Sequence, residues 1–115
     1  MQSSNPDRRY DTRLPVAQAS SNPLSATLGV VPRAAMVCDV SLHGLGLITL
    51  DPPPVDSLVP VWLATSVGAA SEMILGRIVH SEPLGGSLHR VGVSCSDIAD
   101  VLVLRTLYER LRRSA

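Results

Sequence analysis

Short apolar runs, with glycine and proline among the residues that separate them, most limit how this chain can fold. The runs have the length of strands, and none is long enough to cross a bilayer as a helix. Such runs with turn residues between them are typical of antiparallel β-barrels and sandwiches. The sequence therefore predicts an all-β domain. The expected strands cover residues 16–20, 24–31, 34–40, 45–50, 58–65, 72–80 and 88–94.

The boundaries of these strands are marked by residues that cannot continue a ladder. Asp51-Pro52-Pro53-Pro54 ends one run abruptly, because proline lacks the backbone N–H that a sheet needs. Gly85-Gly86 is expected to form the turn of a closing hairpin. Gly46, near the start of its strand, indicates a bend or a close backbone approach.

In the C-terminal segment the apolar residues recur at the spacing of a helix. Ser96 is the expected N-cap of a helix, and Asp97 and Asp100 follow in the first turn, where carboxylates favour the helix dipole. Val103 and Leu107 broaden the apolar face beyond one sheet contact, which suggests surplus surface for a protein partner or a second copy. Apolar residues at helical spacing are Ile98, Val101, Leu104, Tyr108 and Leu111, and the arginines of the last turn are Arg110, Arg112 and Arg113.

Composition restricts the class of protein. The 115 residues suffice for one compact domain, and 45% hydrophobic residues predict a folded chain. We expect an arm over residues 1–15, a barrel over 16–95 and a C-terminal helix over 96–115. The formal net charge of zero gives no support to nucleic-acid binding. Without an apolar N-terminal stretch we expect no signal peptide and a cytoplasmic protein with no membrane span. The start of the sequence and the charged C-terminal helix favour a complete chain over a piece of a larger protein, and this alternative stays open.

Two arginines near the N-terminus, Arg9 and Arg13, are separated by three residues, and Arg8 precedes them. All ten basic residues of the chain are arginine. An arginine side chain can donate to both Hoogsteen acceptors of guanine, stack on the ring and bind phosphate through its planar fork. Arginines on an arm could therefore close over a ligand that carries guanine and phosphate.

A second motif, Asp39-x-Ser41-x-x-Gly44, lies between two expected strands. A carboxylate accepts hydrogen bonds from the N–H donors on the other edge of guanine, and a serine hydroxyl can donate or accept. Asp39 and Ser41, two residues apart at a strand end, are expected to point to the same face. Gly44 is expected to turn the backbone with a positive φ and let it approach the ligand.

Both motifs, in this order on an all-β pattern, resemble the PilZ domain, a bacterial receptor module for cyclic di-GMP. Residues 73–79 and 90–93 look like the closing hairpin of that family. The resemblance implies a six- to seven-stranded antiparallel β-barrel with a C-terminal α-helix. It also implies that Arg9 and Arg13 contact phosphate and guanine, and that Arg8 favours a stacked pair of ligands. The second motif would then hold the other guanine edge through Asp39, Ser41 and Gly44.

One position departs from the family pattern. His80 follows Gly76-Arg77-Ile78-Val79, where the family often has a tryptophan. The departure changes the expected wall of the pocket and leaves the main contacts as they are.

The sequence leaves two functions open and disfavours a third. The first is a cyclic di-GMP receptor whose arm closes over the ligand and signals to a protein partner. The alternative is a PilZ-like interaction domain that binds no nucleotide, for which the broad apolar helix is the support. A catalytic site is not expected, because the sequence has no nucleophile elbow, paired carboxylates or phosphate loop. A metal or cofactor is not expected either, because the three histidines and two cysteines lack ligand spacing.

Overall fold

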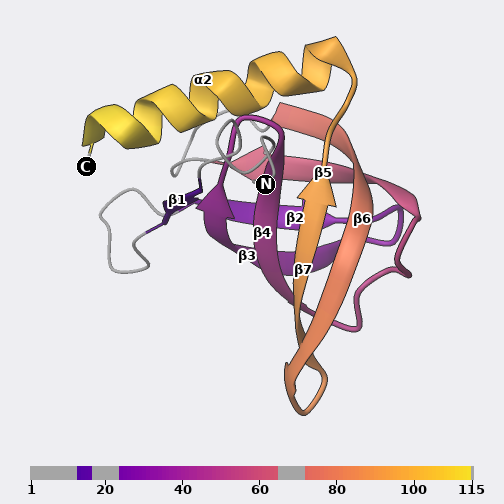
Figure 1. Cartoon of the computed structure of the whole chain (residues 1–115). Coiled ribbons are helices and arrows are strands. Elements are labelled where there is room, and N and C mark those ends of the chain that lie inside the picture. The colour runs from indigo at the N-terminus through magenta and orange to yellow at the C-terminus, as the bar shows by residue number, and fades with distance from the viewer. Residues whose placement is uncertain (1–12, 17–23, 65–71, 115) are drawn as a thin grey trace, which may run out of the picture.

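The computed structural model of the chain describes residues 13–16, 24–64 and 72–114. The helix lies across one end of the strands, and a long hairpin projects from the other end (Figure 1). In chain order the described elements are β1 (Leu14–Pro15), β2 (Ser25–Leu28), β3 (Arg33–Val40), β4 (Gly44–Leu50), β5 (Leu58–Ala64), β6 (Glu72–Gly85), β7 (Leu88–Ser94) and α2 (Ile98–Ser114).

Six of the described strands close into an antiparallel barrel. They pair in the order β3-β2-β5-β6-β7-β4, and the pairing of β4 with β3 closes the ring. β1 is an additional short strand, which pairs with Asp39 and Val40 at the end of β3. It uses the edge of β3 that β2 occupies farther back, over residues 33–36. The predicted all-β barrel with a C-terminal helix is confirmed.

The barrel interior is aliphatic. Along β5, Val59, Val61 and Leu63 are buried, and the residues between them face outward. Leu104 and Leu107 of α2 join the same core and cover one end of it. Burial of a Val, Leu or Ile side chain is worth about 1.5–3 kcal/mol, so this interior is what holds the outer faces of the strands in register.

The predicted strand boundaries agree with the structure, with informative differences. Leu14 and Pro15, the last residues of the expected arm, form β1, while residues 17–20 of the first predicted strand lie outside the described ranges. The run predicted over 24–31 ends as a strand at Leu28, because Gly29, with a φ of 94°, begins a turn. β6 continues past its predicted end at His80, because the residues up to Gly85 pair with β7.

The helix begins one residue later than its predicted cap implies. The backbone N–H of Ala99 donates to Oδ1 of Asp97 at 3.0 Å, so Asp97 is the N-cap and the prediction of Ser96 was wrong. An aspartate in this position accepts a helix N–H and also places a negative charge at the positive end of the helix dipole.

The apolar surface of α2 is divided differently from the prediction. Leu107 is buried in the core and Val103 packs against it, so neither is surplus. The exposed apolar residues of the helix are Ile98 and Leu102, which lie four apart on its outer face. A contact of α2 with a partner or a second copy stays a prediction, and these two residues are the apolar groups available for it.

Candidate functional site

The carboxylate of Asp39 lies between two arginines from distant parts of the chain. Nη1 of Arg13 donates to Oδ1 at 2.8 Å, and Nη2 of Arg90 donates to Oδ2 at 2.6 Å. Arg13 directly precedes β1, whose pairing of Pro15 with Asp39 fixes where this arginine starts. Arg90 comes from β7, on the other side of β4. Charge-assisted bonds of this length are among the stronger hydrogen bonds in proteins.

A β-bulge aims Asp39 at this position. The pairing of β3 with β4 shifts between Val37 and Asp39, so that Cys38 is the additional residue. Val37 lies opposite the buried Leu47 and faces the core, and simple alternation would turn Asp39 inward as well. The extra residue instead places Asp39 opposite Gly46, on the outer face of the barrel.

Gly46 provides the space that the carboxylate occupies. A Cβ built on Gly46 would lie 2.7 Å from each carboxylate oxygen of Asp39, a separation that real contacts do not show. The expected close approach at this glycine is therefore present, and the group that approaches is the side chain of Asp39. The side chain of Asp39 is 9% exposed, whereas those of Arg13 and Arg90 are 41% and 43% exposed. Solvent and solutes can thus reach the cations before they reach the anion.

The turn after β3 is fixed by Ser41 and Gly44. Both the backbone N–H and the hydroxyl of Ser41 donate to the carbonyl oxygen of Gly44, at 2.9 and 3.3 Å. Ser41 is fully buried, so its hydroxyl faces into the turn. Gly44 does not have a positive φ, and that part of its predicted role was wrong. A Cβ on Gly44 would lie 2.3 Å from the carbonyl oxygen of Val93, so glycine is needed here because β7 passes close by.

Most of the sequence matches one known protein family. The model of the PilZ domain matches residues 7–112. The chain belongs to the PilZ domain family. Members of this family are in general binding modules and receptors for cyclic di-GMP, although some PilZ domains do not bind it. No curated protein matches the sequence.

The PilZ motifs meet at the outer wall of the barrel. Of the residues assigned to the ligand by sequence, the structure brings Arg13 and Asp39 into direct contact and places the turn residues beside them. Arg8 and Arg9 lie outside the described residues. The two PilZ motifs are thus joined by an ion pair between residues 26 positions apart.

Arg90 is the member of the Asp39 cluster that sequence reasoning missed. It belongs to the run identified as the closing hairpin, but no motif spacing connects it with Asp39, 51 positions away. The signal that could have found it is the register of the sheet. Gly46 pairs with both Asp39 and Gly92, and Arg90 lies two residues from Gly92 on the same outward face. That register depends on the bulge in β3, which no residue pattern in the sequence predicts.

The two cysteines are free thiols with different surroundings. Cys38, in the bulge beside the cluster, is half-buried, and burial raises its pKa while the nearby Arg90 guanidinium opposes the rise. Cys95 is buried, and its burial, with the Asp100 carboxylate nearby, raises the pKa of its thiol to about 12. Neither thiol is activated for nucleophilic chemistry, because a lowered pKa is what activation requires.

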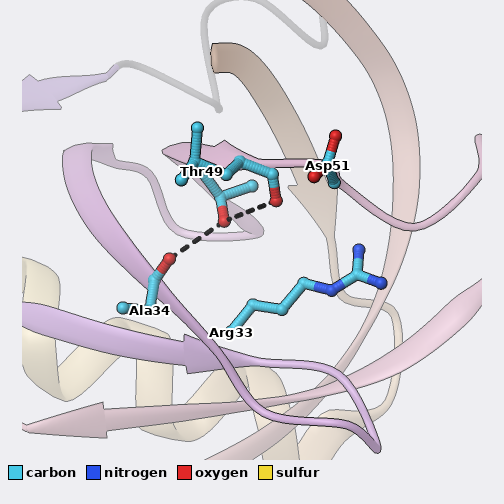
Figure 2. A pocket seen from close by; sticks show the side chains of 5 residues that line it. Arg33, Ala34, Thr49 and Asp51 are labelled. Atoms are coloured by element: carbon cyan, nitrogen blue, oxygen red, sulfur yellow. Dashed lines mark hydrogen bonds between the residues drawn. The ribbon is translucent and has the colours of Figure 1, made fainter. Parts of the chain in front are cut away.

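A depression of about 320 Å³ at the far end of β3 and β4 is a weaker candidate site. Figure 2 shows that Thr49 uses its hydroxyl to donate to the carbonyl oxygen of Ala34, at 2.9 Å, so this group is not available to a ligand. Arg33 and Asp51 bring opposite charges that offset each other. The Asp39 cluster, with two cations and one anion, is the better place for a doubly negative ligand.

In the part of the chain that the structure describes, no helix has the length and apolarity needed to cross a membrane. The same residues contain no group of three or more His, Cys, Asp or Glu side chains that could hold a metal ion.

Proposed function

We propose that this PilZ domain is a cytoplasmic cyclic di-GMP receptor, without catalytic activity, whose ligand site contains the Arg13–Asp39–Arg90 cluster. The observation that carries the proposal is a buried carboxylate with both oxygens bound by half-exposed arginines. A purely structural ion pair needs only one cation. Two cations that share one anion give the three-residue cluster itself a net positive charge, which suits a ligand with two phosphates.

Ligand binding is proposed to exchange the partners of this cluster. The phosphates and the Hoogsteen edge of guanine bind the arginines, and the guanine N–H donors take over the carboxylate of Asp39. Each exchange replaces one charge-assisted bond with another, so no buried charge is left without a partner. Arg8 and Arg9 are proposed to complete the site as the arm closes, and Ser41 and Gly44 to hold the turn that positions Asp39.

Isothermal titration of the purified chain with cyclic di-GMP, with GTP as the control ligand, tests this proposal. We expect saturable heat for cyclic di-GMP alone, and its stoichiometry distinguishes one ligand from a stacked pair. Arg13→Ala and Arg90→Ala should each weaken binding about tenfold or more, since bonds between charged groups contribute about 1.5–3 kcal/mol.

Arg105→Ala is the matched control, because Arg105 is an exposed arginine on α2 and lies outside the cluster. Its affinity should equal that of the wild type. A flat titration of the wild type would contradict the receptor function, and full affinity in both Arg13→Ala and Arg90→Ala would contradict the proposed site.

A protein partner is proposed to read the ligand-bound state. Arg13 directly precedes β1, so a ligand that draws Arg13 away from Asp39 acts on the strand that pairs with the end of β3. The partner would then sense a change in β1 and in the arm before it. A pull-down with and without cyclic di-GMP, repeated with Arg13→Ala, checks this step, because only ligand-dependent capture that the variant loses supports it.

The second candidate function, an interaction domain that binds no nucleotide, is favoured by a different observation. Trp62 and Met73 pair directly across β5 and β6 and are both half-exposed, and large apolar side chains of this kind are enriched in protein interfaces. A folded wild type that captures a partner equally well with and without cyclic di-GMP would support this function over the receptor.

A further inference from the structure

A row of four residues crosses the outer wall of the barrel at the candidate site. Asp39 on β3 pairs with Gly46 on β4, Gly46 pairs with Gly92 on β7, and Gly92 pairs with His80 on β6. Directly paired residues of neighbouring strands point to the same face of a sheet, so this row has a side chain at each end and none in the middle.

The two end side chains lean inward over the glycines. A Cβ on Gly92 would lie 2.3 Å from Nε2 of His80, just as one on Gly46 would meet the carboxylate of Asp39. The imidazole therefore lies over β7 and the carboxylate over β4. Because neighbouring strands are about 4.8 Å apart, the two groups lie roughly one strand spacing from each other. His80 thus faces the Asp39 cluster from the side opposite to β3.

The imidazole of His80 is not committed to a protein partner. It makes no hydrogen bond or ion pair with the residues that the structure describes. Among the residues that the structure describes, the charged groups on the same face are Arg90 on β7, Glu82 opposite Arg90 on β6, and Asp39 with its partner Arg13 across β4. Gly46 and Ile48 of β4 carry no charge. Two arginines and two carboxylates offset each other around the ring, so the charge of a bound ligand decides the local balance.

We infer that His80 is a ligand-facing residue whose protonation makes cyclic di-GMP binding pH-dependent, with affinity rising as the pH falls. The inference rests on the proposed function. An imidazole changes charge between about pH 5 and 8, whereas the phosphodiesters of the ligand stay ionised throughout that range. Two added negative charges favour the imidazolium, so the complex holds the proton more tightly than the free protein. By linkage, protonation then tightens binding.

The size of the effect follows from how much more tightly the complex holds the proton than the free protein does. A difference of about tenfold in proton binding gives up to about a tenfold change in ligand affinity. Isothermal titration at about pH 8 and about pH 5.5 spans the transition. We expect wild-type affinity to rise about tenfold from the higher pH to the lower one.

Four variants separate His80 from the other histidines. His80→Gln, which is neutral at both pH values, should bind with the weaker affinity at both. His80→Lys, which is charged at both, should bind with the tighter affinity at both. His89→Gln and His43→Gln are the controls, because His89 contacts the carbonyl oxygen of Ser87 in the hairpin and His43 lies in the turn after β3. Both should keep the wild-type pH dependence.

The outcomes distinguish this inference from the proposed function. Wild-type binding with the same affinity at both pH values, or a pH dependence that survives in His80→Gln or vanishes in His43→Gln, overturns the inference and leaves the receptor function standing. Absence of wild-type binding at both pH values overturns the receptor function. Because His80 is exposed, thermal unfolding of His80→Gln should match the wild type, which shows that any change in binding is local.

Discussion

Two parts of the outer wall of this barrel cover the same aliphatic interior and differ in the chemistry of their exposed side chains. On one wall the row Asp39, Gly46, Gly92 and His80 has glycines at its centre, and the charged or polar ends lean over bare backbone. On the other, Thr27, Trp62 and Met73 form a row across β2, β5 and β6. Trp62 and Met73 are 46% and 44% exposed, so this row has large apolar side chains where the first row has glycines.

The difference shows how one fold can display two kinds of surface. The core requires only that inward positions be aliphatic, and both walls meet that requirement. The side chains at outward positions can therefore differ according to the ligand or protein that they contact. Glycines at the centre leave room for the side chains of Asp39 and His80 to lie over the backbone of β4 and β7, whereas a Trp–Met pair offers apolar area to a protein.

Gly44→Ala should have the largest effect on stability, because the backbone of β4 lies close to the backbone of β7 at Gly44. The new Cβ would lie 2.3 Å from the carbonyl oxygen of Val93, so β4 and β7 would have to separate. We expect the free energy of unfolding to fall by about 3 kcal/mol, measured by urea denaturation.

The control for this variant is Gly86→Ala in the hairpin. A Cβ there meets nothing within 4 Å, and only the φ of 58° opposes it, at a cost of about 1 kcal/mol. Equal destabilisation by the two variants would show that the close approach of β4 and β7 is not what Gly44 provides.

Gly46→Ala should break the site with a smaller effect on the fold. Its Cβ would displace the carboxylate of Asp39, and the bonds to Arg13 and Arg90 would be lost or lengthened. We expect cyclic di-GMP to bind about thirtyfold more weakly, by isothermal titration, which corresponds to about one charge-assisted hydrogen bond. Adding Asp39→Ala to this variant should cause little further loss, because both changes act through one carboxylate. Wild-type affinity in Gly46→Ala would remove Asp39 from the ligand site.

The fold and part of the candidate site could be predicted from the sequence. Alternation and turn residues report which side chains face the core, and the barrel and helix follow from them. The outward row does not follow, because the bulge at Cys38 reverses the expected direction of Asp39. Arg90 and His80 could be assigned to the site only after that register was known. Trp62 lies on the outer face because its neighbours Val61 and Leu63 take the inward positions.

The two thiols differ in what surrounds them, because Cys95 lies in the interior and Cys38 lies beside the charged cluster. Burial raises the pKa of Cys95 from 9.0 to about 12, while Arg90 opposes the rise at Cys38. Because the folded state holds the proton more tightly, the stabilisation is complete below the unfolded pKa and is lost as the pH rises from about 9 to about 12. We expect the free energy of unfolding to fall by up to about 1.4 kcal/mol per pH unit in that window.

Urea denaturation of the wild type, Cys95→Ala and Cys38→Ala at several alkaline pH values checks this expectation. Most of the slope should vanish in Cys95→Ala and persist in Cys38→Ala. A slope that depends equally on both thiols would mean that Arg90 does not favour the thiolate of Cys38.

Trp62→Ala should have the smallest effect and tests whether the two walls are independent. The side chain is half-exposed and pairs with Met73, and a cross-strand pair of this kind contributes about 0.2–1 kcal/mol. We therefore expect the free energy of unfolding to fall by about 1 kcal/mol and the affinity for cyclic di-GMP to stay within about twofold of the wild type, because distant sites act additively. Asp39→Ala is the opposite variant, with lost ligand binding and an intact apolar wall. If Trp62→Ala instead weakened ligand binding as strongly as Asp39→Ala, the ligand would bear on both walls, and the barrel would act as one surface.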